Sequence, residues 1–178
     1  MPDYFHLEVA GIARDLPICK INDDLSIAAF IMFGDVELTI ACAKGLLDKA
    51  PEFDVIVTAE AKAIPLAYEM SRQSGKKYIP ARKGKKLYMQ EPIVIETKSI
   101  TTKEQQILCI DKPDLDYLNG KQVLIVDDVI STGGSLAAME AIVARSTGVV
   151  VGRAAVLAEG DAARRQDIIF LAPLPLIV

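Results

Sequence analysis

Residues 123 to 135 read VLIVDDVISTGGS, and this stretch decides the fold. The apolar run Val123 to Val126 is typical of a short strand that is buried on both faces, as in a parallel sheet. Ser131 to Ser135 form a glycine-rich turn whose N–H groups, at the start of a helix, can bind a phosphate. Asp127 and Asp128 repel a phosphate, but their oxygens accept hydrogen bonds from sugar hydroxyls or from waters on a metal ion. The stretch therefore predicts a sugar site beside a phosphate site.

Helical and apolar segments alternate on both sides of this stretch. Helical spacing of apolar residues predicts helices at 37–50, 63–73 and 135–146, and apolar runs predict further strands at 55–58, 77–81, 107–110 and 149–158. The alternation predicts an α/β fold with a Rossmann-like parallel sheet and helices on both faces. Ligands of such sheets bind outside the carboxyl ends of the strands, so segments 58–62, 82–86 and 127–135 should open onto one crevice.

The two ends of the chain follow a different pattern. Phe5, Leu7 and Val9 alternate with less apolar residues, as in a half-exposed strand. The length of 178 residues suits one domain. We therefore expect a single domain spanning 1–178, in which 1–35 and 159–178, with the terminal FLAPLPLIV, form a small hood beside the sheet.

Composition excludes several classes of protein. The net charge of −4 and the pI near 5.1 give no general attraction to nucleic acid or to anionic membranes, so we expect neither as a partner. The amino-terminal residues lack the pattern of a signal peptide and no apolar run is long enough to span a membrane, which favours a cytoplasmic protein. Cys19, Cys42 and Cys109 are widely spaced, which favours core thiols over a zinc site or disulfides.

Three motifs together resemble a known family. VLIVDDVISTGGS resembles the phosphoribosyl-pyrophosphate motif of type I phosphoribosyltransferases. TAEAKAIPLAYEM (58–70) and YIPARKGKKL (78–87) are similar to the pyrophosphate loop and the basic strand end of the adenine and xanthine phosphoribosyltransferases and of the purine repressor. The resemblance covers about residues 30 to 172. It implies the type I fold, a purine phosphoribosyltransferase activity, Mg²⁺ carried by the substrate rather than by a protein metal site, and a homodimer.

The resemblance also implies roles for individual residues. Asp127 and Asp128 would bind the ribose hydroxyls, and they form a catalytic set with Glu60. Glu60 or Glu96 would assist with the proton of the base, and the sequence leaves both open. The substrate-binding residues would comprise the pyrophosphate loop, the basic segment and the phosphate loop, namely Ala61, Lys62, Arg82, Lys83, Lys86, Val129, Ile130, Ser131, Thr132, Gly133, Gly134 and Ser135.

The acceptor base is inferred from two positions. The asparagine and lysine that bind an oxopurine in the xanthine enzyme align by eye with Met32 and Gly160. That alignment implies a pocket walled by Phe30, Met32, Phe33 and Ile130, without the donors that an oxopurine needs. A site that leaves such groups unpaired discriminates strongly against the oxopurine. Adenine is therefore the favoured acceptor, with xanthine or hypoxanthine as the alternative.

Other interpretations stay open. A strand that ends in Asp is also typical of a Walker B segment, although the chain has no GxxxxGK[ST] loop. The run RKGKK is equally compatible with a solvated charge cluster, and 87–106 with either an ordinary hairpin or a flap over the reaction centre. The purine-repressor resemblance allows a regulator that binds phosphoribosyl pyrophosphate without turnover. Such a repressor has a basic winged helix of roughly 60 residues, whereas the segment before Val55 reads as strand-like and acidic, which favours the enzyme.

Overall fold

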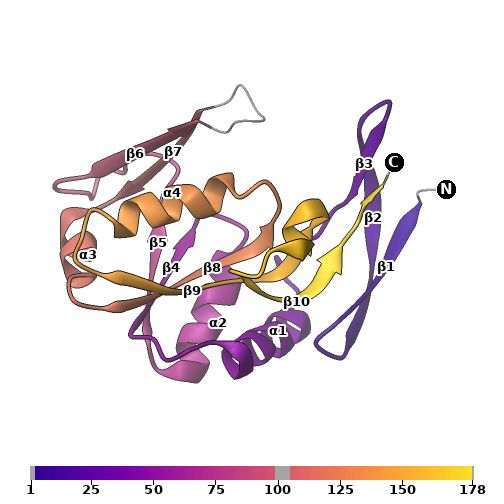
Figure 1. Ribbon diagram of the computed structural model, residues 1–178, viewed down its shortest axis with the longest axis horizontal. Coiled ribbons are helices and arrows are strands. Elements are labelled where there is room, and N and C mark those ends of the chain that lie inside the picture. Colours follow the sequence, from indigo (N-terminus) through magenta and orange to yellow (C-terminus); the bar gives the residue numbers. More distant parts are fainter. Residues whose placement is uncertain (1–2, 99–104, 178) are drawn as a thin grey trace.

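The computed structural model describes residues 3–98 and 105–177, and a parallel sheet forms its centre (Figure 1). The sheet has five strands in the order β10-β9-β8-β4-β5, all paired in parallel. Their bounds are β4 (Val55–Ala59), β5 (Lys77–Ala81), β8 (Gln122–Ile130), β9 (Val149–Glu159) and β10 (Ile169–Leu174). This arrangement confirms the predicted α/β fold.

Helices cover both faces of the sheet (Figure 1). α1 (Val36–Lys49) and α2 (Ile64–Ser74) pack on one face, and α4 (Gly134–Val143) packs on the other. The fully buried strand residues alternate between the two cores: Val55 and Val57 face α4, whereas Ile56 between them faces α1 and α2. Two short helices, α3 (Lys112–Tyr117) and the 3-10 turn η1 (Gly160–Arg164), complete the layer structure. No helix among the described residues is long and apolar enough to cross a membrane.

The strand order changes between the neighbours β4 and β8, because the chain adds strands outward on opposite sides of this pair. From β4 it proceeds through α2 outward to β5, and from β8 it proceeds through α4 outward to β9 on the other side. The β4–β8 pairing ends at Thr58 and Val126, where the Thr58 hydroxyl donates a 2.8 Å hydrogen bond to the Val126 carbonyl. Beyond this point β8 continues beside β9 alone, as far as Ile130. The separation leaves a crevice at the carboxyl ends of the strands, where open α/β sheets bind ligands.

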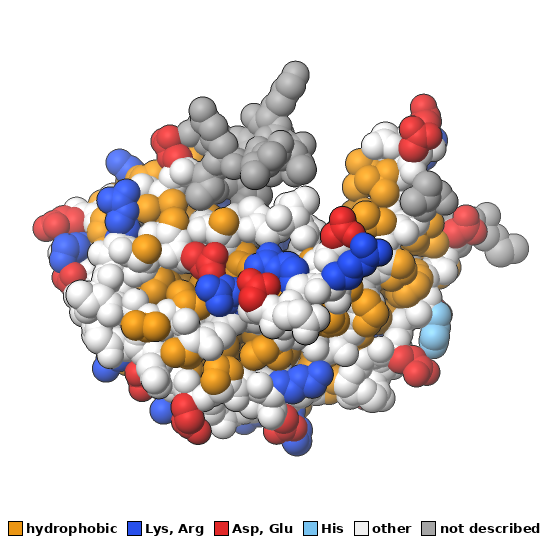
Figure 2. Space-filling model, viewed as in Figure 1, with side chains coloured by type: hydrophobic (Ala, Val, Ile, Leu, Met, Phe, Trp, Pro, Cys, Tyr) orange, Lys and Arg blue, Asp and Glu red, His pale blue; other side chains and the backbone are white. Residues whose placement is uncertain are grey.

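The hood is an antiparallel sheet in the order β1-β2-β3-β11. Its strands are β1 (Tyr4–Val9), β2 (Ile12–Asn22), β3 (Leu25–Ala28) and β11 (Leu176–Ile177). Arg14 of β2 joins the hood to α1 through ion pairs of 2.7 Å each with Asp35, the N-cap residue of that helix, and with Glu37. Figure 2 shows one end of the hood projecting from the body of the protein, whereas Leu7, Val9 and Leu16 of the hood pack into the core that contains α1.

The prediction that residues 159–178 belong to the hood is wrong for most of this segment. β10 lies in the parallel sheet beside β9, and only β11 pairs with the hood, through β3. The physical reason is that β10 buries Leu174 and half-buries its neighbours against the core around α1, which an isolated hood strand could not do.

The predicted strand at 107–110 exists but lies outside the parallel sheet. β7 (Gln105–Ile110) pairs with β6 (Ile93–Lys98) in a two-stranded antiparallel hairpin. Ile95, Leu108 and Ile110 bury their side chains in the core around α4, so this apolar run is buried by a helix and not by sheet neighbours. Of the two interpretations of 87–106, the hairpin is present, while its connection at 99–104 lies outside the described residues.

Two of the three cysteines are core thiols, as predicted. Cys42 and Cys109 are fully buried, and burial raises the pKa of the Cys42 thiol to about 12. Cys19 is exposed on β2, so the prediction is wrong for this residue. All three are free thiols.

Candidate active site

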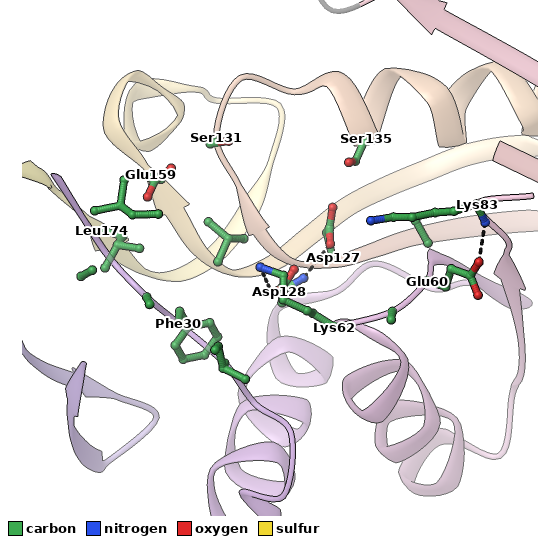
Figure 3. A pocket seen from close by; sticks show the side chains of 17 residues that line it. Phe30, Glu60, Lys62, Lys83, Asp127, Asp128, Ser131, Ser135, Glu159 and Leu174 are labelled. Carbon is green, nitrogen blue, oxygen red and sulfur yellow. Dashed lines mark hydrogen bonds and ion pairs between the residues drawn. The ribbon is translucent and has the colours of Figure 1, made fainter. Parts of the chain in front are cut away.

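A cavity of about 530 Å³ opens at the carboxyl ends of the strands, and its size suits a small-molecule site. Its lining comes from the β3–α1 segment, the ends of β4, β5, β8 and β9, the phosphate loop and β10, with the residues Ile27, Ala28, Ala29, Phe30, Ile31, Ala59, Glu60, Ala61, Lys62, Lys83, Asp127, Asp128, Val129, Ser131, Ser135, Glu159 and Leu174. Figure 3 shows the acid pair in the middle, Glu60 and Lys83 on one side, and Phe30, Leu174 and Glu159 on the other. The three predicted segments therefore do converge.

The acid pair forms the floor of the cavity. Asp128 is 4% exposed, and its Oδ2 atom accepts no hydrogen bond from the described residues, although the Lys62 ammonium lies 3.3 Å away. Burial and then the charge of Asp128 raise the pKa of the Asp127 carboxyl well above its ordinary value. The Asp128 backbone N–H donates to Asp127 Oδ1 at 2.9 Å. The pair is thus short of positive charge and of donors, which sugar hydroxyls or a cation can supply.

Glu60 organises the basic segment rather than the centre of the cavity. Its carboxylate accepts 2.6 Å hydrogen bonds from the Arg82 guanidinium and from the Lys83 backbone N–H, and Lys86 lies 3.6 Å away. Burial opposes ionisation of Glu60, but the hydrogen bonds from Arg82 and Lys83 and the charges of Arg82 and Lys86 lower its pKa below the ordinary value. A carboxylate held in this way is a weak proton acceptor. The geometry therefore favours a positioning role over the predicted proton transfer.

The alternative proton acceptor lies outside the cavity. Glu96 is an exposed residue of β6 and is absent from the cavity lining. Neither predicted candidate for the proton transfer therefore has its carboxylate aimed at the acid pair.

Of the three basic residues predicted to contact the substrate, namely Arg82, Lys83 and Lys86, one lines the cavity. Lys83 does so, and Figure 3 shows its ammonium end reaching toward Asp127. Arg82 and Lys86 lie outside the lining, because Glu60 attracts both and Arg82 also donates to the Tyr88 hydroxyl. The prediction that all three face the substrate therefore differs from the geometry. Lys62 and Lys83 are the ammonium groups that face the cavity among the described residues.

The phosphate loop lines a second hollow of about 90 Å³ that adjoins the main cavity through Asp127. Gly133 has a φ of +84°, a conformation that side chains disfavour, and it precedes the first turn of α4. The hollow is formed by the predicted loop residues Val129, Ile130, Ser131, Thr132, Gly133, Gly134 and Ser135, with Asp127 and Leu136. A helix N-terminus with a glycine turn gives such a hollow an affinity for anions.

Of the four residues predicted to wall a base pocket, Phe30 is the one that lines the main cavity. Phe30 lines the cavity, whereas Met32 is 1% exposed in the core beneath α1, and Phe33 is 54% exposed on the outside. The cavity lining on this segment ends at Ile31, and Met32 and Phe33 lie further along the chain toward α1. Ile130 is buried in the core around α4 and lines the second hollow at residues 131–135, not the main cavity.

Sequence reasoning missed several residues at the hood end, namely Ile27, Ala29, Ile31, Leu174 and Glu159. The strand predicted at 149–158 ends beside the acid pair in the sheet order, so the rule on strand ends could have found Glu159. The hood residues carried no such signal, because their approach to the sheet depends on tertiary packing.

The acid pair suits a Mg²⁺ ion that arrives with the substrate better than a resident metal ion. The described residues contain no group of three or more His, Cys, Asp or Glu side chains that could enclose a metal. Mg²⁺ usually binds through one or two carboxylates together with substrate phosphates and water. Asp127 and Asp128, with the unsatisfied Oδ2 atom of Asp128, fit an ion that arrives with a phosphorylated substrate.

Comparison with known proteins identifies the family. Residues 38–171 match the phosphoribosyl transferase domain. The chain belongs to the type I phosphoribosyltransferase family. It is 38% identical over 112 residues to the adenine phosphoribosyltransferase of Petrotoga mobilis, covering 60% of this chain and 58% of that protein. A hypoxanthine/guanine phosphoribosyltransferase of Methanothermococcus okinawensis is 39% identical over 88 residues, covering 49% of this chain and 44% of that protein.

The fold agrees with the family as well. The crystal structure of the adenine phosphoribosyltransferase from Thermoanaerobacter pseudethanolicus superimposes with a TM-score of 0.64 at 25% identity, covering 77% of this chain and 79% of that one. The sequence match spans less than two thirds of the length of the two curated relatives.

Proposed function

We propose that this phosphoribosyltransferase moves the 5-phosphoribosyl group of phosphoribosyl pyrophosphate to a purine base, with adenine as the acceptor. The observation that carries the proposal is the cavity itself. It combines an acid pair, in which Asp128 is buried and Asp127 half-buried, a phosphate loop at a helix N-terminus and two ammonium groups around one space of about 530 Å³. The products are a nucleoside monophosphate and pyrophosphate.

The arrangement suggests how the donor lies. Its ribose hydroxyls donate to Asp127 and Asp128, and its 5-phosphate occupies the hollow of residues 131–135. Its pyrophosphate lies toward Lys62 and Lys83, the ammonium groups of the cavity. The base then enters from the hood end, opposite the pyrophosphate, so that it can attack the ribose C1 from behind the leaving group.

The chemistry follows from the charges that develop. The bond from C1 to the pyrophosphate oxygen breaks while a bond from C1 to a base nitrogen forms, and the proton of that nitrogen passes to the leaving pyrophosphate or to water. During the step the sugar gains positive and the leaving group negative charge. Lys62 and Lys83 stabilise the leaving pyrophosphate, and the acid pair stabilises the sugar. Mg²⁺, when bound with the substrate, supplies further positive charge at the phosphate oxygens. Glu60 keeps the basic segment in place through Arg82 and the Lys83 backbone.

Adenine is proposed because the hood end is mostly apolar. Ile27 and the exposed Ile31 offer apolar contact surface, while Phe30 and Leu174 are nearly buried in the wall, and backbone groups of 27–31 can read an aminopurine without a side-chain signature. The similarity to a named adenine phosphoribosyltransferase supports the choice. An oxopurine acceptor is the second candidate, supported by the similarity to the hypoxanthine/guanine enzyme. The regulatory alternative makes one different prediction, which is binding without turnover.

Steady-state turnover tests the proposal. Phosphoribosyl pyrophosphate and Mg²⁺ are supplied at saturation with adenine, hypoxanthine, guanine or xanthine, and kcat/KM is measured for each base. We expect adenine to give the highest value. A higher value for any oxopurine contradicts the choice of base, and binding of the donor without turnover of any of the four supports the regulator. Size-exclusion chromatography with light scattering tests the homodimer, which stays a prediction.

A further inference from the structure

Glu159 lies at a position of the cavity that the proposed reaction leaves without a role. It is the last residue of β9, where it pairs in register with Leu174 of β10. The preceding residue, Ala158, pairs with Ile130, so Glu159 lies beside the start of the phosphate loop. Figure 3 shows Glu159 close to Leu174 and Ser131, at the end of the cavity away from Lys83.

The surroundings of Glu159 are apolar and one-sided. The cavity wall at this end consists of Ile27, Ala28, Ala29, Phe30, Ile31 and Leu174, so Glu159 is the ionisable side chain there among the lining residues. In the part of the chain that the structure describes, no hydrogen bond or ion pair engages its carboxylate. Burial raises the pKa of the Glu159 carboxyl, and the charge of Lys62 offsets this only in part. A half-buried carboxylate that no donor of the described chain engages can accept a hydrogen bond from water or, in its place, from a bound ligand.

We propose that Glu159 determines base specificity by accepting a hydrogen bond from an amino group on the edge of the incoming purine. This inference rests on the proposed function and deepens it. Along the cavity, the proposed pyrophosphate subsite lies at Lys83, the sugar subsite over the acid pair and the base subsite at the hood end. A base bound between this apolar wall and the acid pair has its edge within the part of the cavity that Glu159 lines.

The chemistry of the two purine classes separates them at this carboxylate. A 6-aminopurine presents an N–H donor at position 6, which matches an acceptor-only group. A 6-oxopurine presents a carbonyl oxygen at the same place, and two acceptors repel each other. An apolar wall alone cannot make this distinction, because it contacts both rings equally well. Glu159 thus discriminates between 6-aminopurines and 6-oxopurines, which the lack of donors for an oxopurine does only in part.

The test compares adenine with unsubstituted purine, which lacks the amino group but keeps the ring. In the unaltered enzyme we expect kcat/KM to be about tenfold to a hundredfold higher for adenine, as a charge-assisted hydrogen bond predicts. Glu159→Ala should lower this ratio about tenfold or more by lowering the value for adenine alone, and the backbone groups of 27–31 account for any preference that persists. Glu159→Gln, whose amide can also donate, should narrow the ratio of adenine to hypoxanthine. A merely structural role would lower all bases together and leave both ratios unchanged, which would overturn the proposal.

Controls separate this inference from the proposed function. Glu52→Gln changes an exposed residue that precedes β4, at the amino ends of the strands and thus opposite the cavity, and it should leave both ratios unaltered. The same comparison is made by calorimetry with AMP and purine riboside 5-monophosphate, which needs no turnover. Preference for AMP that is lost in Glu159→Ala supports the role of Glu159 even if the chain is not catalytic. If the Ala variant does not fold, the ratios of the Gln variant decide.

Discussion

Neutralising the acid pair is the sharpest perturbation of the proposed mechanism. In the double variant Asp127→Asn with Asp128→Asn, each side chain keeps its shape but loses a charge-assisted hydrogen bond to the ribose, worth about 1.5–3 kcal/mol. The sum of about 3–6 kcal/mol corresponds to a loss of about 10² to 10⁴ in kcat/KM. Stability should not fall, because the substitution removes two like charges from a buried site. Lys62, the partner of Asp128, is 53% exposed and regains water.

The assay is steady-state kinetics with phosphoribosyl pyrophosphate and adenine, together with thermal unfolding of each variant. Asp23→Asn with Asp24→Asn is the matched control, because it neutralises another adjacent acid pair in the exposed turn between β2 and β3. The control should retain full activity. Near-normal turnover by a folded Asp127/Asp128 variant would refute the assignment of the acid pair to the ribose.

Further predictions concern the other parts of the site. Lys83→Ala should weaken pyrophosphate binding about tenfold while AMP affinity, measured by calorimetry, stays the same; equal weakening of both would make Lys83 a general anion contact. Glu60→Gln should raise the KM for phosphoribosyl pyrophosphate by loosening the basic segment, and an unaltered KM would count against a positioning role. Gly133→Ala places a side chain at a φ of +84°, with its Cβ 3.1 Å from the Arg165 guanidinium. This variant should lose about 1–2 kcal/mol of stability and bind the donor more weakly. An unchanged melting temperature would contradict this expectation. The pKa of Asp127 is raised in the folded state above its ordinary 3.8. The free energy of unfolding should therefore fall as the pH rises from the pKa of the unfolded chain to that of the folded chain. Denaturant titrations over this pH range should show a smaller fall in Asp127→Asn, and an equal fall would contradict this.

The architecture was predictable because the apolar pattern is strong. Runs such as Val123 to Val126 are buried on both faces and have no alternative to a parallel sheet, and the rule on strand ends then locates the crevice. The run at 107–110 has the same pattern, yet a helix buries it from one side. Apolar runs report burial, and they do not specify which neighbour supplies it.

Side-chain direction was less predictable than location. Arg82 and Lys83 are adjacent in the sequence, but the guanidinium turns to Glu60 whereas the ammonium lines the cavity. Which of two neighbouring cations pairs with a carboxylate depends on distances of a few ångströms that no motif encodes. The prediction for Met32 and Phe33 was wrong for a related reason, because the directions of their side chains depend on how the hood joins α1.

The most direct test of the account is a single turnover with the enzyme in excess over labelled phosphoribosyl pyrophosphate, in the presence of Mg²⁺ and adenine. This measurement follows the chemical step without interference from product release. The account predicts that the donor is converted completely to AMP and pyrophosphate in equal amounts, and that the Asp127/Asp128 variant converts it at least about a hundredfold more slowly. Recovery of unchanged donor from a protein that demonstrably binds it, with each of the four bases, would contradict the account.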